Sequence, residues 1–317
     1  MGRSNRFGAL GACLVGAAVA LLMSPVAPVR AADADYGQKA DTLGTGEPAE
    51  EEEDGPNRGR VSFTIGQDFT TAYFFRGILQ ERDGFIYQPY AEMAINLFEG
   101  ERVLTSIDLG MGVWFSLQTE KTLASGSGPS NLYETDYYPS LSLGWEYGLT
   151  TSLAYVVYTG PNGSFNTIQQ LDFGIAWDDS EVFDSPVSFG PSVTFSFELD
   201  NTSFGDKEGG YFELAAAPSI ELEISEAAAD YPITLAAPLA LGLSMYDYYE
   251  TATQDQTFGF FSFGANAGVP LAFIPSDFGS WSASLGINVL VLSDTLEEVN
   301  DGDSPFPVGV FSLVMEY

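Results

Sequence analysis

The chain has 317 residues and a formal net charge of −33, because 44 Asp and Glu outnumber 11 Lys and Arg. It holds no His and one Cys, which excludes internal disulfides, imidazole metal sites and Ser-His or Cys-His catalytic pairs. We therefore expect no enzyme, no cofactor and no metal site, and the strong acidity also predicts no nucleic-acid partner.

Residues 1–31 have the features of a secretory signal peptide. Two arginines are followed by an apolar run from Phe7 to Met23 and by a small-x-small site that ends at Ala31. This arrangement predicts cleavage after Ala31. An N-terminal membrane anchor is the alternative, although the apolar run is at the short end for a spanning helix.

Residues 32–60 are rich in Gly, Pro, Ala and acids, including the run Glu50-Glu51-Glu52-Glu53-Asp54. Nothing in this stretch can bury a hydrophobic core, so we expect a disordered acidic periplasmic segment. A role in binding cations or in contacting the cell wall is the alternative.

Residues 61–317 alternate apolar and polar side chains in about twelve segments, each long enough for a tilted strand to cross a bilayer. Short and long connections alternate between the segments, as they do in outer-membrane barrels. This predicts an all-β fold: a transmembrane antiparallel up-and-down β-barrel of about twelve strands, in the outer membrane of a Gram-negative-type bacterium. The expected segments are 62–76, 85–97, 102–117, 133–147, 149–159, 166–177, 186–199, 210–224, 232–246, 258–270, 279–292 and 306–317.

The distribution of charge separates a membrane barrel from a soluble β-sandwich. In the last segment Phe311, Leu313, Met315 and Tyr317 share one face, and throughout the chain mid-segment carboxylates fall only on the opposite, polar face. A lipid-facing charge costs a few kcal/mol at the bilayer midplane, so the apolar face is expected to contact lipid. Three prolines also fall on the apolar face, and the pattern does not explain their presence. They are Pro139, Pro191 and Pro218.

The polar face supplies the residues that would line the lumen. A row of carboxylates could favour cations, as acidic rings do in cation channels, or its members could be solvated or hydrogen-bonded without affecting selectivity. Arg76 could pair with one of these acids. The predicted lumen-lining residues are Asp68, Arg76, Glu92, Asp108, Glu146, Asp172, Glu198, Glu213, Glu221 and Glu223.

The stretch from Thr71 to Gln80, read as the end of the first strand, resembles the signature Ser-Asp-Tyr-x-Phe-Arg-Gly-x-Ser-Gln of the TorF-type porins. This resemblance implies an outer-membrane channel but names no substrate. Matching positions are Tyr73, Phe75, Arg76, Gly77 and Gln80, and the departures are Thr71, Ala72 and Leu79.

Two functions fit these patterns. The first is a porin-like channel that passes small hydrophilic solutes, with a preference for cations, and that contacts outer-membrane lipid and could form homo-oligomers. The second is a closed structural or adhesive barrel, whose lumen is blocked by inward aromatics. The aromatics expected inside are Trp114, Tyr138, Tyr158 and Tyr246. Acidic loop residues such as Asp301 and Asp303 lack EF-hand spacing and are expected to be solvated.

Overall fold

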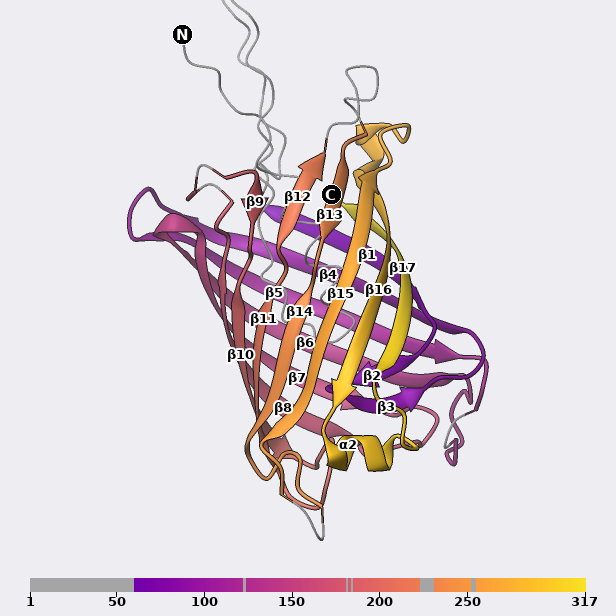
Figure 1. Ribbon diagram of the computed structural model, residues 1–317. Coiled ribbons are helices and arrows are strands. Elements are labelled where there is room, and N and C mark those ends of the chain that lie inside the picture. The colour runs from indigo at the N-terminus through magenta and orange to yellow at the C-terminus, as the bar shows by residue number, and fades with distance from the viewer. Residues whose placement is uncertain (1–59, 122–123, 181, 184, 223–230, 252–254) are drawn as a thin grey trace, which may run out of the picture.

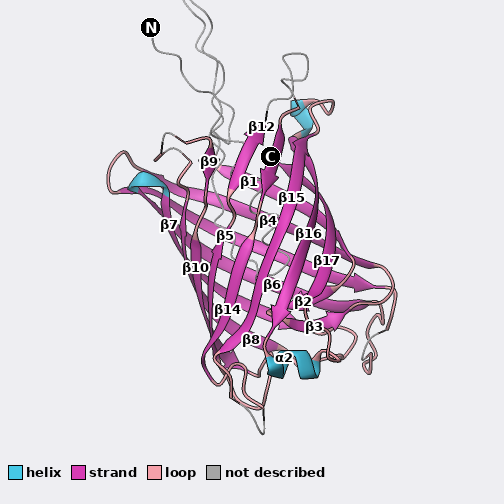
Figure 2. Cartoon of the chain, in the orientation of Figure 1, coloured by secondary structure: helices cyan, strands magenta, loops and turns pink. Residues whose placement is uncertain are grey.

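The computed structural model of the protein describes residues 60–121, 124–180, 182–183, 185–222, 231–251 and 255–317. The expected signal peptide, residues 1–31, lies outside the described residues, as does the acidic segment 32–60 except for Arg60. Figures 1 and 2 show the described chain, which consists mainly of strands that run around a barrel.

One antiparallel sheet closes on itself, because β14 pairs with both β11 and β15. Three of the twelve barrel strands are each made of two pieces. This confirms the predicted twelve-stranded antiparallel barrel. The barrel strands are β1 (Val61–Thr70), β4 (Ile86–Glu99), β5 (Leu104–Gln118), β6 (Leu132–Trp145), β7 (Leu149–Thr159), β8 (Ile168–Trp177), β9 with β10 (Val187–Ser188 and Ser192–Asp200), β11 with β12 (Gly210–Ala216 and Ser219–Leu222), β13 with β14 (Ile233–Ala236 and Leu239–Tyr246), β15 (Phe258–Pro270), β16 (Ser280–Leu292) and β17 (Phe306–Glu316).

Burial alternates along the barrel strands with a period of two. In β5 the side of the strand with Asp108 and Gly112 is buried, whereas Leu109 and Met111 on the other side are 47% and 60% exposed. Large exposed apolar residues recur in this way on nearly every strand. A closed barrel whose outer surface is apolar satisfies all its backbone hydrogen bonds and can therefore be surrounded by hydrocarbon.

The prolines explain why three barrel strands are interrupted. Pro191 separates β9 from β10, Pro218 separates β11 from β12, and Pro238 separates β13 from β14. Proline has no N–H to donate to the ladder, but its carbonyl still accepts: Trp177 N–H donates to Pro191 (3.0 Å) and Ala237 N–H to Pro218 (2.8 Å). The breaks thus leave the wall closed. Pro139 differs, because β6 continues through it opposite Met111.

Both ends of the barrel chain lie at the same end of the barrel, where Phe63 and Tyr317 exchange backbone hydrogen bonds of 2.8 and 2.9 Å. Figure 1 shows this end, which we call the turn end, opposite the end that carries helix α2 (Asp294–Val299), which we call the loop end. Among the residues that the structure describes, no helix combines the length and hydropathy needed to span a bilayer.

Asp179 organises the turn that follows β8 at the turn end. Its carboxylate accepts hydrogen bonds from the Ser188 hydroxyl (2.8 Å), from the Phe189 N–H (2.9 Å) and from the Gly190 N–H (2.9 Å). Burial on its own would raise the pKa of this carboxyl, but these hydrogen bonds outweigh burial and hold the pKa below its ordinary value. The turn is therefore stabilised by the ionised form of Asp179.

We expect Asp179→Asn to lower the free energy of unfolding by about 1–2 kcal/mol at neutral pH, because charge-assisted hydrogen bonds are lost. A depressed pKa contributes stability above the unfolded pKa of about 4, and that contribution is lost as the pH falls through the folded value. Urea unfolding at pH 7 and at about pH 3 should therefore show a difference that shrinks in acid. Asp277→Asn, at an exposed aspartate of η3 (Ser276–Phe278), is the control; equal effects of the two changes would contradict this role.

Candidate functional site: the occluded lumen

A small hairpin between β1 and β4 lies inside the barrel at the loop end. Its strands, β2 (Tyr73–Phe75) and β3 (Ile78–Glu81), pair only with each other in the described sheet topology. Arg76 and Gly77 form the turn with φ values of 48° and 81°, which a continuing strand cannot adopt. The first barrel strand ends at Thr70 and residues 73–75 belong to the hairpin, so the expectation that this strand reaches residue 76 is wrong.

Arg76 is 1% exposed and contacts the wall opposite the hairpin's own stem. One terminal nitrogen, Nη1, donates to Gln170 Oε1 (2.9 Å) and to the Tyr248 hydroxyl (3.0 Å), and Nη2 donates to Ser196 Oγ (2.8 Å). Nη2 also lies 3.9 Å from the buried carboxylate of Asp172. Arg76 was predicted to line the lumen; here its side chain reaches across the lumen to the far wall, because the hairpin that carries it folds inward.

Aromatic rings surround the guanidinium of Arg76. Its Cζ lies 4.2 Å from the centre of the Tyr211 ring, 5.0 Å from that of Phe75 and 5.3 Å from that of Tyr248. The neighbouring Tyr249 donates its hydroxyl hydrogen to the Arg76 carbonyl (2.9 Å). Cation–π contact is strongest away from water, so these rings add to the binding of the arginine at this place.

The hairpin also contacts the wall formed by β5, β6 and β7. The Tyr73 hydroxyl donates to Glu134 Oε2 (2.8 Å), and the Tyr133 hydroxyl donates to Gln80 Oε1 (2.5 Å). The Phe75 ring meets the Tyr158 ring edge to face, with 5.3 Å between their centres. These contacts combine hydrogen bonds with aromatic packing.

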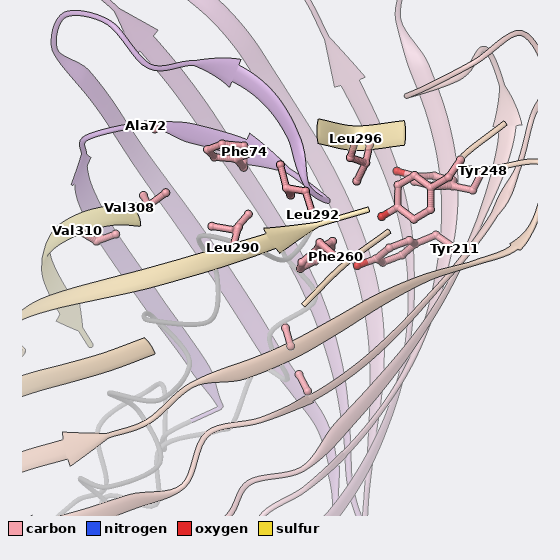
Figure 3. Close-up of a cluster of buried hydrophobic side chains, with 13 residues drawn as sticks. Ala72, Phe74, Tyr211, Tyr248, Phe260, Leu290, Leu292, Leu296, Val308 and Val310 are labelled. Atoms are coloured by element: carbon pink, nitrogen blue, oxygen red, sulfur yellow. The ribbon is translucent and has the colours of Figure 1, made fainter. Parts of the chain in front are cut away.

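The opposite face of the hairpin packs on an apolar cluster from β11, the strands β14 to β17, helix α2 and the connection after β14. Phe74 lies edge to face with Phe306, with 5.0 Å between the ring centres. Figure 3 shows the cluster extending from Val308 and Val310 to Tyr211. These side chains occupy the lumen next to the hairpin at this end. The buried members are Ala72, Phe74, Tyr211, Ala215, Ala240, Tyr248, Tyr249, Phe260, Leu290, Leu292, Leu296, Val308 and Val310.

Helix α2 and the chain after it hold the hairpin from the loop end. Asn300 donates through Nδ2 to the Gly77 carbonyl (2.7 Å) and accepts from the Leu79 N–H (2.9 Å). Further out, Arg82 pairs with Asp301 (3.0 Å) and Asp303 (2.7 Å). These two aspartates, expected to be solvated, thus take part in surface ion pairs.

Most of the predicted lumen acids have buried side chains that accept hydrogen bonds. Asp108 accepts from Asn96 and Ser106, and Glu92 accepts from the Tyr138 hydroxyl (3.0 Å). Glu198 differs in role, because it accepts from the backbone N–H groups of residues 203 and 209 and so fixes the loop after β10. The buried predicted acids are Asp68, Asp108, Asp172, Glu198 and Glu213, with Glu92 and Glu221 partly buried.

Two predicted residues are not placed on the barrel wall. Glu146 lies exposed in the turn η1 (Glu146–Gly148), because Tyr147 and Gly148 take φ values of 64° and 75° and end β6 at Trp145. Glu223 lies outside the described residues. Among the expected inward aromatics, Tyr138 and Tyr158 are buried, but Tyr246 is 49% exposed.

Two tyrosines lie flat against inward-facing glycines. A Cβ on Gly66 would be 2.0 Å from Tyr90 Cζ, and one on Gly112 would be 2.0 Å from Tyr138 Cε2. Each ring therefore occupies the space that the side chain of any residue other than glycine would need at position 66 or 112. This explains why the polar face alternates glycine with larger side chains.

Several residues around the hairpin were not predicted as part of the site. Glu134 and Asp136 are buried side by side on the polar face of β6, and Gln170 is neutral, so a search for charges alone misses it. Tyr248 and Tyr249 fall in a connection but are fully buried. Two adjacent aromatics in an otherwise polar connection are the sequence signal that could have indicated them.

These features define the class of the protein. A closed twelve-stranded antiparallel barrel with an apolar outer surface and a polar interior is an outer-membrane β-barrel protein of a Gram-negative-type bacterium. Within the described ranges, no three His, Cys, Asp or Glu side chains form a group that could hold a metal ion.

Comparisons with solved structures return other outer-membrane barrels. The chain is similar to the NanC porin (8% identity, 80% of this chain and 98% of that chain covered, TM-score 0.42). It is also similar to an outer-membrane channel from Pseudomonas putida F1 (10%, 81% and 94%, 0.44) and to the translocator domain of the autotransporter NalP from Neisseria meningitidis (14%, 81% and 87%, 0.39). No protein-family model and no curated protein matches the sequence. The class stated above follows from this chain's own strand order and burial.

Proposed function

We propose that the protein is a porin-like channel that passes small hydrophilic solutes through the outer membrane and prefers cations. The observation that carries this proposal is the charge of the barrel interior. Carboxylates on six barrel strands are buried there, whereas Arg76 is the one buried basic side chain among the described residues. Acidic side chains lining a pore attract cations and slow anions.

The resemblance to TorF-type porins supports the same class of function. The matching residues Tyr73, Phe75, Arg76 and Gly77 form the hairpin inside the barrel, where they contact the wall on both sides. A signature concentrated in a hairpin inside the lumen fits a role in passage through the barrel.

A closed structural or adhesive barrel is the second candidate. The specific observation in its favour is that the hairpin and its apolar cluster fill the lumen at the loop end. Planar-bilayer recordings and the swelling of sugar-loaded liposomes distinguish the two functions. We expect discrete conductance steps from the purified protein; their absence, together with no swelling, would support the closed barrel.

We expect the double variant Asp68→Asn, Glu92→Gln to reduce the cation preference, measured as the reversal potential in a salt gradient. Both side chains belong to the inward faces of the neighbouring barrel strands β1 and β4, outside the hairpin. The matched control is Glu120→Gln, Glu208→Gln, which removes the same charge from exposed loop positions. The proposal of cation preference fails if the wild type prefers anions, or if control and test variants shift equally.

A further inference from the structure

The hairpin, residues 73–81, contacts the wall on several sides of the lumen at the loop end. Going round the barrel, β10 is the sixth strand from β1 in either direction, so the two strands face each other across the lumen. The hairpin starts beside β1, and its tip contacts Ser196 on β10 and Gln170 on β8. It therefore spans the full width of the bore.

The two ends of the hairpin are held in different ways. At its stem, Thr71 N–H donates to Gly309 on β17 (3.0 Å), and Asn300 accepts from Leu79. At its tip, the Arg76 side chain makes the hydrogen bonds to β8 and β10 of the far wall, while Tyr249 and Asn300 donate to the backbone carbonyls of Arg76 and Gly77. Loss of the Arg76 side-chain contacts would therefore detach the tip from β8 and β10 while leaving the stem attached.

The far wall is built to receive a cation. Gln170 presents its oxygen to Arg76 because its nitrogen donates to Asp172 Oδ1 (2.5 Å) and to the Tyr158 hydroxyl (3.2 Å). The carboxylate of Asp172 is fully buried, and Arg76 Nη2 is the cationic group 3.9 Å away. A buried carboxylate without a charge partner is strongly disfavoured, so the wall and the tip stabilise each other.

From this geometry we infer that Arg76 is the positioning residue that holds the β2–β3 hairpin across the lumen and thereby sets how much the channel conducts. The inference rests on the proposed channel function. The solutes concerned are those of the proposed channel. When the tip leaves the far wall, Asp172 and its neighbours face the pore as an acidic wall, so the opened channel passes more cations. Arg76 acts through the hairpin and does not itself need to touch the solute.

The test combines two readouts, one of which does not depend on conduction. Val156 on β7 is fully buried, in a cluster against which Phe75 and Trp114 pack. In a Cys13→Ser background, Val156→Cys introduces a single thiol. The rate at which a small water-soluble methanethiosulfonate modifies this thiol reports release of the hairpin. Single-channel conductance of the same variants gives the second readout.

We expect Arg76→Gln to raise the rate of thiol modification roughly tenfold or more, the change in an opening equilibrium that follows from losing one charge-assisted hydrogen bond. Single-channel conductance should rise severalfold. Arg76→Lys keeps the charge and should restore slow modification in part, because lysine lacks the planar fork of donors. The matched control is Arg82→Gln, which removes the same charge from a partly exposed arginine paired with Asp301 and Asp303; it should behave as the wild type.

The outcomes separate the inference from the proposed function. Unchanged modification and conductance in Arg76→Gln, with barrel unfolding also unchanged, would overturn the role of Arg76 and leave the channel proposal intact. Faster modification without conductance in any variant, including one with residues 72–81 replaced by a Gly-Ser linker, would support Arg76 as the positioning residue and reject the channel. Should Arg76→Gln not fold, the rates of thiol modification and the conductance of Arg76→Lys are compared with those of the wild type. Increases in both support the inference, and unchanged values overturn it.

Discussion

Met111→Arg is expected to lower the free energy of unfolding by about 2–4 kcal/mol, the cost of an arginine facing lipid at the midplane of a bilayer. Met111 is the central residue of β5 and is 60% exposed on the outer surface of the barrel. Its neighbours across the strand pairs are Met93 and Pro139, which offer no charge partner. The measurement is equilibrium unfolding by denaturant of the protein folded into lipid vesicles.

The control for this prediction places the same arginine near the membrane interface instead of at the midplane. Val103 is 63% exposed, next to the start of β5 at the turn end. Val103→Arg should cost only about 0–1 kcal/mol, because an arginine near the interface reaches water and headgroups. Equal losses at the two positions would show that the exposed apolar surface is not surrounded by hydrocarbon.

Gly112→Ala is expected to lower the free energy of unfolding by about 1–3 kcal/mol, the usual cost of adding a methyl group to a filled interior. The new Cβ would lie 2.0 Å from Cε2 of Tyr138, so the ring has to move. That movement would also break the hydrogen bond from the Tyr138 hydroxyl to Glu92 (3.0 Å). Denaturant unfolding in the same vesicles measures the loss.

A double-mutant cycle tests the cause of that loss. Removing the ring with Tyr138→Ala should make the added methyl group of Gly112→Ala nearly neutral, because the space becomes free. Gly309→Ala is the single-site control, since its Cβ would meet Thr71 Cγ2 at an ordinary 3.4 Å. The explanation fails if Gly112→Ala costs the same with and without the Tyr138 ring.

The structure changes how the acidity of the interior is understood. Several lumen acids accept hydrogen bonds that hold structure: Glu198 fixes the loop after β10, and Asp172 orients Gln170 toward Arg76. Such acids combine a structural role with their charge. The selectivity test therefore uses Asp68 and Glu92, because Asp68 is on β1 and Glu92 accepts its hydrogen bond from Tyr138 on β6, not from the hairpin.

The twelve barrel strands could be predicted from the sequence because their cause is local. Each strand that faces lipid on one side and the interior on the other must alternate every second residue, so its position is visible in the strand itself. The fifth and tenth expected segments, 149–159 and 258–270, coincide with β7 and β15. Carboxylates such as Asp108 and Glu213 fall on the buried face for the same reason.

Only the tertiary structure decided what fills the barrel. The turn at Arg76 and Gly77 follows a stretch that continues the strand pattern, so nothing in its periodicity separates a longer strand from an inward hairpin. The partners of Arg76 come from residues about 94 to 172 positions away, and pairings of that range depend on barrel closure. The alternation of side chains determines which face meets lipid, whereas the occlusion of the lumen depends on which distant side chains closure brings together.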